Sequence, residues 1–327
     1  EGIGAVVLAI RFIPKMGFAV GIYNAVFHSI SAFCNAGFDL MGRYEEYSSL
    51  TAYSGDIVIN ITIMLLIIIG GLGFIVWWDL WDKFRKVLRK ELSPSRVFRV
   101  LRLQSKLVLT MTGILVFSGA FLVFVFESGN PSTLKGAPLG TKLMASFFQS
   151  VTTRTAGFYT MDQSLLSTPT VIISLLWMFI GGSPMGTAGG VKTTTIAVLI
   201  LSIAAYLQGK KDVEVYGRRI RESYLRSAMV VAGTSVLILF TMTVLLSAVM
   251  PGVDLADVLY EITSAGATVG LSRGLTPQLN VAGKWIVILT MYLGRIGPLT
   301  LGTAVVMRVR NRPGSTTHLG EEDIMIG

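Results

Sequence analysis

Apolar side chains fill several long and almost uninterrupted blocks of this chain. The blocks cover residues 54–79, 106–127, 168–207, 227–250 and 282–308. Each is near or above the roughly 20 residues that an α-helix needs to cross the hydrocarbon core of a bilayer. The pattern predicts an all-α polytopic membrane protein.

The opening segment, Glu1 to Ile13, is apolar but too short to cross a bilayer. It has no basic region at its start and runs directly into a polar loop, so it is not typical of a signal peptide. We expect it to be the end of a helix.

Composition agrees with a lipid environment, because only 14% of the residues are charged and an ordinary soluble domain has about 25%. The net charge of +9 is concentrated in segment 80–106, with nine Lys/Arg, and segment 208–226, with six. Cytoplasmic loops of membrane proteins carry this excess of positive charge. We therefore expect both segments and the C-terminus to be cytoplasmic, and we expect no nucleic-acid partner.

Three short apolar stretches lie between the crossings, and each ends in a similar way. They read Ser31-Ala-Phe-Cys-Asn-Ala-Gly37-Phe38, Val151-Thr-Thr-Arg-Thr-Ala-Gly157-Phe158 and Ser264-Ala-Gly-Ala-Thr-Val-Gly270-Leu271. Each follows about 12 residues of predicted helix, near 18–33, 142–153 and 254–265. We infer a repeated unit of helix, re-entrant pore helix, extended loop and helix around one pore.

The chemistry of these loops favours a monovalent cation. Non-helical backbone at membrane depth is tolerated only when protein buries it or when it lines a watery cavity. Inward carbonyl groups replace the hydration shell of such an ion, and glycine permits the turn that aims them. None of the three segments contains Asp or Glu. The predicted ion-binding residues, which would hold K⁺ at backbone carbonyls, are Asn35, Ala36, Gly37, Thr155, Ala156, Gly157, Thr268, Val269 and Gly270.

These segments, together with Gly181-Gly-Ser-Pro-Met-Gly-Thr-Ala-Gly-Gly-Val-Lys192, resemble the Trk/Ktr/HKT superfamily of potassium transporters, and the Ktr-type membrane subunit in particular. The resemblance implies four loops around one pore, each supplying a filter glycine. Only three are present here. We therefore expect one further repeat, and the start of the helix that ends near Ile13, before Glu1.

The repeats predict an organisation in six parts. Residues 1–79 hold the end of an outer helix, a pore loop and an inner helix, and residues 106–207 hold a repeat with an interrupted inner helix. Residues 227–308 hold the last repeat, the linkers are 80–105 and 208–226, and 309–327 is a cytoplasmic tail.

The block 168–207 is about twice the spanning length and must break at its glycines. It is either two helices joined by a flexible turn or, as the resemblance implies, an intramembrane gate below the filter. The gate residues would be Gly182, Ser183, Pro184, Gly186, Gly189, Gly190, Lys192 and Arg295.

Two basic residues have two interpretations each, and three further residues have a structural one. Arg295 either satisfies neighbouring carbonyls or closes the gate, and Lys192 either belongs to the gate or extends to the cytoplasmic surface. Arg154 is expected to point behind its loop, because a cation facing the pore would repel the ion. His28 and Cys34 are expected to be packed core, not ligands.

The predicted function is K⁺ uptake across the bacterial cell membrane, with Na⁺ dependence typical of the family. The resemblance implies a homodimer that works with a cytoplasmic KtrA-like ring of nucleotide-binding regulatory subunits, because this chain has no nucleotide motif of its own. A Trk-type subunit and a cation-coupled secondary transporter remain alternatives. The absence of HExxH and GxSxG motifs argues against an enzyme.

Overall fold

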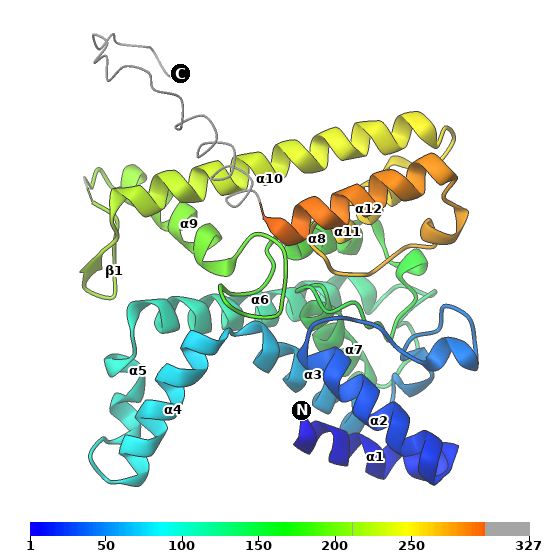
Figure 1. Cartoon of the computed structure of the whole chain (residues 1–327), viewed down its shortest axis with the longest axis horizontal. Coiled ribbons are helices and arrows are strands. Elements are labelled where there is room, and N and C mark those ends of the chain that lie inside the picture. Colours follow the sequence, from blue (N-terminus) through cyan, green and yellow to red (C-terminus); the bar gives the residue numbers. More distant parts are fainter. Residues whose placement is uncertain (211, 298–327) are drawn as a thin grey trace, which may run out of the picture.

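The computed structural model describes residues 1–210 and 212–297 and is mostly helical (Figure 1). A two-stranded hairpin, β1 (Glu214–Val215) and β2 (Arg218–Arg219), is the exception within these ranges. The helices are α1 (Gly2–Met16), α2 (Phe18–Phe33), α3 (Ile57–Gly71), α4 (Phe74–Leu88), α5 (Val97–Val100), α6 (Leu103–Glu127), α7 (Leu139–Thr152), α8 (Thr168–Phe179), α9 (Thr193–Leu207), α10 (Glu222–Val249), α11 (Leu255–Gly266) and α12 (Val281–Ile296).

The helices form three similar units, as the repeated sequence predicts. In each unit a first helix packs on a pore helix, which a loop connects to a third helix. The pore helices are α2, α7 and α11, close to the predicted ranges 18–33, 142–153 and 254–265. Along the chain they are flanked by α1 and α3, by α6 and α8, and by α10 and α12. Helix α8 packs on α6 and on the next pore helix, α11.

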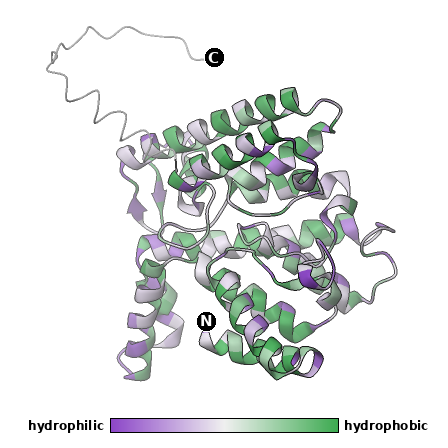
Figure 2. Ribbon diagram, turned by 45° about the vertical axis from the view of Figure 1, so that its right-hand side comes forward, coloured by the Kyte–Doolittle hydropathy of each residue, from purple (hydrophilic) through white to green (hydrophobic). Residues whose placement is uncertain are grey.

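Two single helices, α6 and α10, are long and apolar enough to cross a bilayer by themselves within the described part of the chain. They run in similar directions across Figure 1, and the ribbon colours of Figure 2 show that hydrophobic residues predominate along the helices. The shorter apolar helices are α2, α8 and α9. The block 282–308 corresponds to α12 as far as Ile296, and its end, with the expected tail 309–327, lies outside the described residues.

The apolar block at residues 54–79 is not one straight helix. Helix α3 ends at Gly71, and α4 leaves it at an angle of 101°. Gly73 lies at the turn with a φ of 87°, a conformation that L-residues with a side chain rarely adopt. The Trp77 indole N–H donates to the Ile69 carbonyl across the bend, 2.9 Å away. The apolar pattern could not show this bend, because both helices are apolar where they meet.

The two basic segments lie at the same end of the molecule. Figure 1 shows α4, α5 and the β1–β2 hairpin together at one end of the long helices. The Tyr216 hydroxyl lies 2.7 Å from the Thr110 hydroxyl, and the Tyr216 ring packs on Phe98 with 5.9 Å between centroids. This common location agrees with the prediction that both segments share one side of the membrane.

Glycine allows the third helix of a unit to approach its pore helix closely. At Gly70 on α3, an added Cβ would lie 1.8 Å from the carbonyl oxygen of Phe33, the last residue of α2. At Gly294 on α12, an added Cβ would lie 2.0 Å from the carbonyl oxygen of Gly266, the last residue of α11. Any side chain at these positions separates the two helices.

We expect Gly70→Ala to lower the thermal stability of the detergent-purified protein. Overpacking costs about 1–3 kcal/mol, which corresponds to a Tm lower by roughly 2–4 °C for each kcal/mol in a protein of this size class. Gly113→Ala is the matched control, since Gly113 is also helical but nothing lies within 4 Å of an added Cβ. The control should be neutral or stabilising by up to about 1 kcal/mol. Equal melting temperatures for the two variants would contradict the close approach.

Candidate functional site

The three loops that follow the pore helices share one backbone conformation. We call residues 34–38, 154–158 and 267–271 the first, second and third glycine loops. The glycines Gly37, Gly157 and Gly270 have φ values of 73°, 94° and 93°. Two residues earlier, Asn35, Thr155 and Thr268 have φ values of 50°, 66° and 55°. Positive φ is uncommon for residues other than glycine, so the repetition at three places indicates one shared turn.

A hydroxyl group near the end of each pore helix ties its own loop back to the helix. The Ser31 hydroxyl donates to the Phe38 carbonyl over 2.7 Å, and the Thr152 hydroxyl donates to the Phe158 carbonyl. In the third loop the direction is reversed, since the Gly270 N–H donates to the Ser264 hydroxyl oxygen over 3.1 Å. These bonds fix the extended backbone on either side of each glycine.

The three glycine loops lie in direct contact, in the order first, second, third. A Cβ at Gly37 would lie 2.2 Å from the Ala156 carbonyl oxygen, and one at Gly157 would lie 2.5 Å from the Val269 carbonyl oxygen. The second loop is therefore in the middle, and all five of its residues are buried. The predicted residues Asn35–Gly37, Thr155–Gly157 and Thr268–Gly270 do come together.

The outer sides of the first and third loops are open. Phe158 and Leu271, which follow their glycines, are 0% and 2% exposed, whereas the equivalent Phe38 is 71% exposed. Gly270 is exposed as well. The three loops thus form an arc that other groups of the described chain do not close.

Two of the three polar residues near the loops lie where the sequence predicts. Arg154 is buried behind the second loop, where its guanidinium lies 3.4 Å from the Thr112 hydroxyl of α6. His28 is fully buried and packs against the rings of Phe12 and Phe158. The expectation that Cys34 is packed core is wrong, because Cys34 is exposed. Cys34 follows the last residue of α2, and its side chain is not enclosed by the packing around that helix.

Residues 180–192, which we call the central loop, separate α8 from α9 and confirm the predicted helix break. Ile180 and Val191 form a parallel bridge at its base, and the Gly182 N–H donates to the Gly189 carbonyl over 3.2 Å. A Cβ at Gly181 would lie 1.9 Å from that same Gly189 carbonyl oxygen. The loop is therefore a closed turn with its own hydrogen bonds, not two helices joined by a free linker.

The central loop contacts all three glycine loops at the residue two positions before the glycine. The Thr187 hydroxyl lies 2.7 Å from the Asn35 side-chain oxygen, and the Gly189 N–H donates to the Thr155 hydroxyl oxygen over 3.0 Å. A Cβ at Gly189 would lie 1.9 Å from the Thr268 hydroxyl oxygen. The sequence predicted that the backbone carbonyls of Asn35, Thr155 and Thr268 bind the ion. Their side chains, in addition, contact the central loop.

The α3–α4 bend holds the opposite side of the central loop. The N–H groups of Ser183 and Thr187 donate to the carbonyls of Gly71 and Gly70, over 3.0 Å and 3.3 Å. The Phe74 N–H, at the start of α4, donates to the Met185 carbonyl over 3.2 Å. The sequence did not indicate these partners or Thr187. The adjacent glycines at 70 and 71 could have indicated a close contact here, but they lie inside an apolar block.

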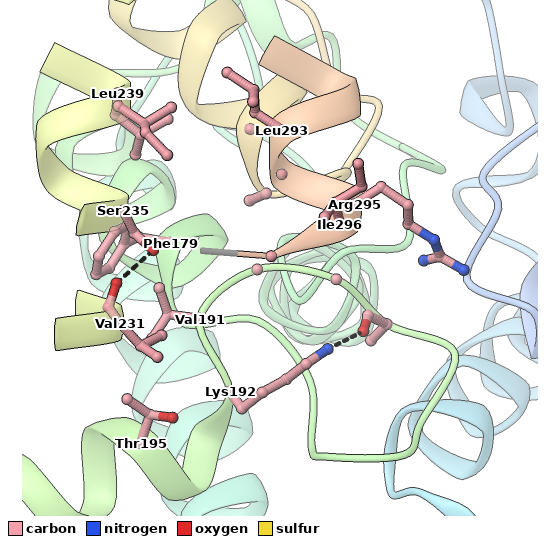
Figure 3. Close-up of a pocket in the computed structure, with 18 of the residues that line it drawn as sticks. Phe179, Val191, Lys192, Thr195, Val231, Ser235, Leu239, Leu293, Arg295 and Ile296 are labelled. Atoms are coloured by element: carbon pink, nitrogen blue, oxygen red, sulfur yellow. Dashed lines mark hydrogen bonds between the residues drawn. The ribbon is translucent and has the colours of Figure 1, made fainter. Parts of the chain in front are cut away.

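Two basic side chains border the central loop beside a cavity of about 460 Å³ (Figure 3). The Lys192 ammonium turns back along the loop and donates to the Ala188 carbonyl over 2.8 Å, so it does not extend away from the loop. Arg295, in the last turn of α12, donates to the Thr187 carbonyl over 3.3 Å. Apolar side chains of α10 and α12, including Leu239 and Leu293, form much of the remaining wall.

The other predicted gate residues all belong to the central loop. Ser183 is fully buried, and its hydroxyl lies 3.1 Å from that of Thr193. Gly190 has a φ of 66°, and a Cβ at Gly186 would lie 2.9 Å from the Gly71 carbonyl oxygen. The Pro184 carbonyl oxygen would lie 2.4 Å from a Cβ at Gly73. Small residues are therefore required on both sides of this contact.

Comparison with known proteins places this arrangement in a known family. Residues 2–312 match the model of a family described as TrkH, cation transport protein. Ktr system potassium uptake protein B of Bacillus subtilis is 39% identical over 92% of this chain and 63% of that protein. Potassium/sodium uptake protein NtpJ of Enterococcus hirae is 37% identical over 99% of this chain and 68% of that protein.

A solved structure has the same fold. The crystal structure of the potassium transporter TrkH from Vibrio parahaemolyticus matches with a TM-score of 0.71 at 18% sequence identity, over 92% of this chain and 61% of that one. The chain thus spans about two thirds of the length of these relatives.

We expect Gly157→Ala to reduce cation uptake, measured as labelled Rb⁺ entering proteoliposomes that contain the full-length protein. The new Cβ would lie 2.5 Å from the Val269 carbonyl oxygen and would displace the second loop from the third. A displacement that costs about 1.4 kcal/mol or more reduces the rate roughly tenfold or more.

Gly136→Ala is the control for this variant. Gly136 also has a positive φ, of 88°, but nothing lies within 4 Å of its added Cβ. The control carries the same backbone strain without the clash, so its uptake should match wild type. Wild-type uptake by Gly157→Ala would contradict a role for the glycine loops in conduction.

Proposed function

This chain belongs to the TrkH family of cation transport proteins, and on that premise we propose that it forms most of a potassium uptake pathway across the bacterial cell membrane. Members of the family are multi-pass membrane transporters, which agrees with the apolar helices and the re-entrant pore helices of this chain. Two relatives that carry potassium uptake in their names support the choice of ion.

The observation that carries the proposal is the convergence of three glycine loops with one shared backbone turn. The residues predicted to bind the ion through their backbone carbonyls, at 35–37, 155–157 and 268–270, lie side by side. The residues of these three loops include no carboxylate. Backbone carbonyls without carboxylates suit a weakly hydrated monovalent cation and not a divalent one, which needs charged oxygen ligands. We propose that these carbonyls form the selectivity filter.

The open arc requires one more element to enclose an ion. Phe38 is mostly exposed while its two equivalents are buried, and Gly270 is exposed at the other end of the arc. We propose that a fourth glycine loop, from a segment outside these 327 residues, fills the space between the first and third loops. Such a loop would bury Phe38 as its equivalents are buried here.

We propose that the central loop is the gate of this pathway. It contacts each of the three glycine loops at the same repeat position, so it occupies the space directly next to the filter. The bonds from Lys192 and Arg295 to its carbonyls hold it there and add positive charge, which repels a cation. Opening requires the loop to exchange these bonds for others.

A cytoplasmic regulatory subunit would act on the basic end of the molecule. Segments 80–106 and 208–226 lie together there, and the α4 helix begins directly at the bend that holds the central loop. We propose that this end docks a KtrA-like nucleotide-binding ring, and that two membrane subunits assemble on it with their C-termini in the cytoplasm. A relative named as part of a Ktr system supports such a partner.

Uptake of labelled Rb⁺ by proteoliposomes that contain the full-length protein tests the proposed function. Excess K⁺ should suppress the uptake, and excess Na⁺ should suppress it much less, because the carbonyl filter prefers the larger ion. Uptake should also persist without an opposing or accompanying ion, which a coupled secondary transporter would not allow. Equal suppression by the two ions would contradict a potassium-selective filter.

We expect Thr187→Val and Arg295→Ala to increase the maximal rate of uptake, since each removes a bond that holds the central loop against the filter. One hydrogen bond contributes about 0.5–1.5 kcal/mol, so the rate should rise roughly two- to tenfold. Thr194→Val, in the first turn of α9, is the matched control and should leave the rate unchanged. An unchanged or lower rate in the folded Thr187→Val and Arg295→Ala variants would count against the gate.

A further inference from the structure

A fully satisfied polar network is buried between the second and third units. The side-chain amides of Gln149 and Gln163 form a reciprocal pair, with N···O distances of 2.8 Å and 3.1 Å. The Tyr260 hydroxyl donates to the Gln163 side-chain oxygen over 2.8 Å, and the Gln163 amide also donates to the Met161 carbonyl over 2.7 Å. These three side chains are at most 1% exposed.

The network joins the parts of the protein that carry two adjacent glycine loops. Gln149 lies on pore helix α7, before the second loop, and Gln163 lies shortly after that loop. Tyr260 lies on pore helix α11, before the third loop. Its ring belongs to the same apolar cluster as Val269 and Leu271 of the third loop. One hydroxyl group therefore connects the scaffold of one loop to the scaffold of the next.

The joint between the first and second units has a different chemistry. There the Leu50 N–H donates to the Tyr159 carbonyl over 3.0 Å, and the Tyr159 N–H donates to the Ser49 hydroxyl oxygen over 3.2 Å. The Tyr159 hydroxyl also donates to the Tyr47 carbonyl, so a main-chain group takes part in each of these three bonds. At the repeat positions equivalent to Tyr260, ten residues before the glycine, the other pore helices have Phe27 and Phe147. Of these three aromatic residues, Tyr260 alone has a hydroxyl group.

We propose that Gln149, Gln163 and Tyr260 are positioning residues that fix the separation of the second and third glycine loops and thereby set the preference for K⁺ over Na⁺. This inference rests on the proposed function of the loops as a filter. None of the three residues touches the ion. They act through α7 and α11, whose loops lie in contact at Gly157 and Val269.

The physical reason is the stiffness that a satisfied buried network gives to its surroundings. Inside a protein each of these bonds is strengthened by the low dielectric constant, and none of the partners has water as an alternative. A filter made of carbonyls discriminates against Na⁺ only while its loops resist closing around the smaller ion. Losing the Tyr260 bond removes the link from α11 to Gln163, which is paired with Gln149 of α7, and allows the loops to adjust.

Tyr260→Phe tests this proposal in the full-length protein reconstituted in proteoliposomes. The readout is the ratio of labelled Na⁺ uptake to labelled Rb⁺ uptake, which does not depend on the amount of folded protein. We expect the ratio to rise roughly two- to tenfold, the factor that one neutral hydrogen bond represents. Tyr53→Phe is the matched control, because Tyr53 is also largely buried but lies in the first unit, and its ratio should equal that of wild type.

Gln149→Met is the second variant, and it breaks the amide pair from the α7 side while the Tyr260 bond remains. It should shift the ratio in the same direction. Should Tyr260→Phe fail to fold, as judged by its elution as a single species in detergent, Gln149→Met decides the question. A wild-type ratio in the folded variants overturns the proposal while leaving the filter intact. Rb⁺ uptake by wild type that excess K⁺ does not suppress would instead overturn the proposed function itself.

Discussion

Backbone amide and carbonyl groups inside a bilayer must find hydrogen-bond partners within the protein, because lipid supplies none. The central loop meets this requirement without being a helix. Its N–H groups at Gly181, Gly182 and Val191 bond within the turn or to its base, and those at Ser183 and Thr187 bond to α3. The loop therefore has a docked position with specific partners. Any movement of the loop must replace these bonds.

The same requirement explains the bend between α3 and α4. The last carbonyls of a helix have no partner within it, and at Gly70 and Gly71 the central loop supplies the missing donors. Because those donors approach from the side, α3 cannot continue in its own direction, and the chain turns at Gly73 into α4. The interrupted helix of the second unit and the bent helix of the first unit thus form one hydrogen-bonded structure. A displacement of α4 acts directly on the central loop.

The sequence predicted the parts of this arrangement that depend on backbone conformation. Matching neighbours around Gly37, Gly157 and Gly270 indicated three equivalent turns, and the glycines at 181–190 indicated the helix break. It did not predict the bend at Gly73, because a hydropathy pattern shows which residues are apolar and not the direction of the chain. It did not predict the exposure of Cys34 either, because the pattern does not show where the packing around the end of α2 stops. The bonds of Thr187 and Tyr260 were also missed, since their partners are distant in the sequence.

Repetition of the backbone does not make the three units equivalent. The first and second units are joined by bonds in which Leu50 and Tyr159 use main-chain groups, whereas the second and third are joined through the side chains of Gln163 and Tyr260. A main-chain bond survives most substitutions, and a side-chain bond is lost when a single residue changes. A single substitution therefore alters the joint between the second and third units more readily than the joint between the first and second units.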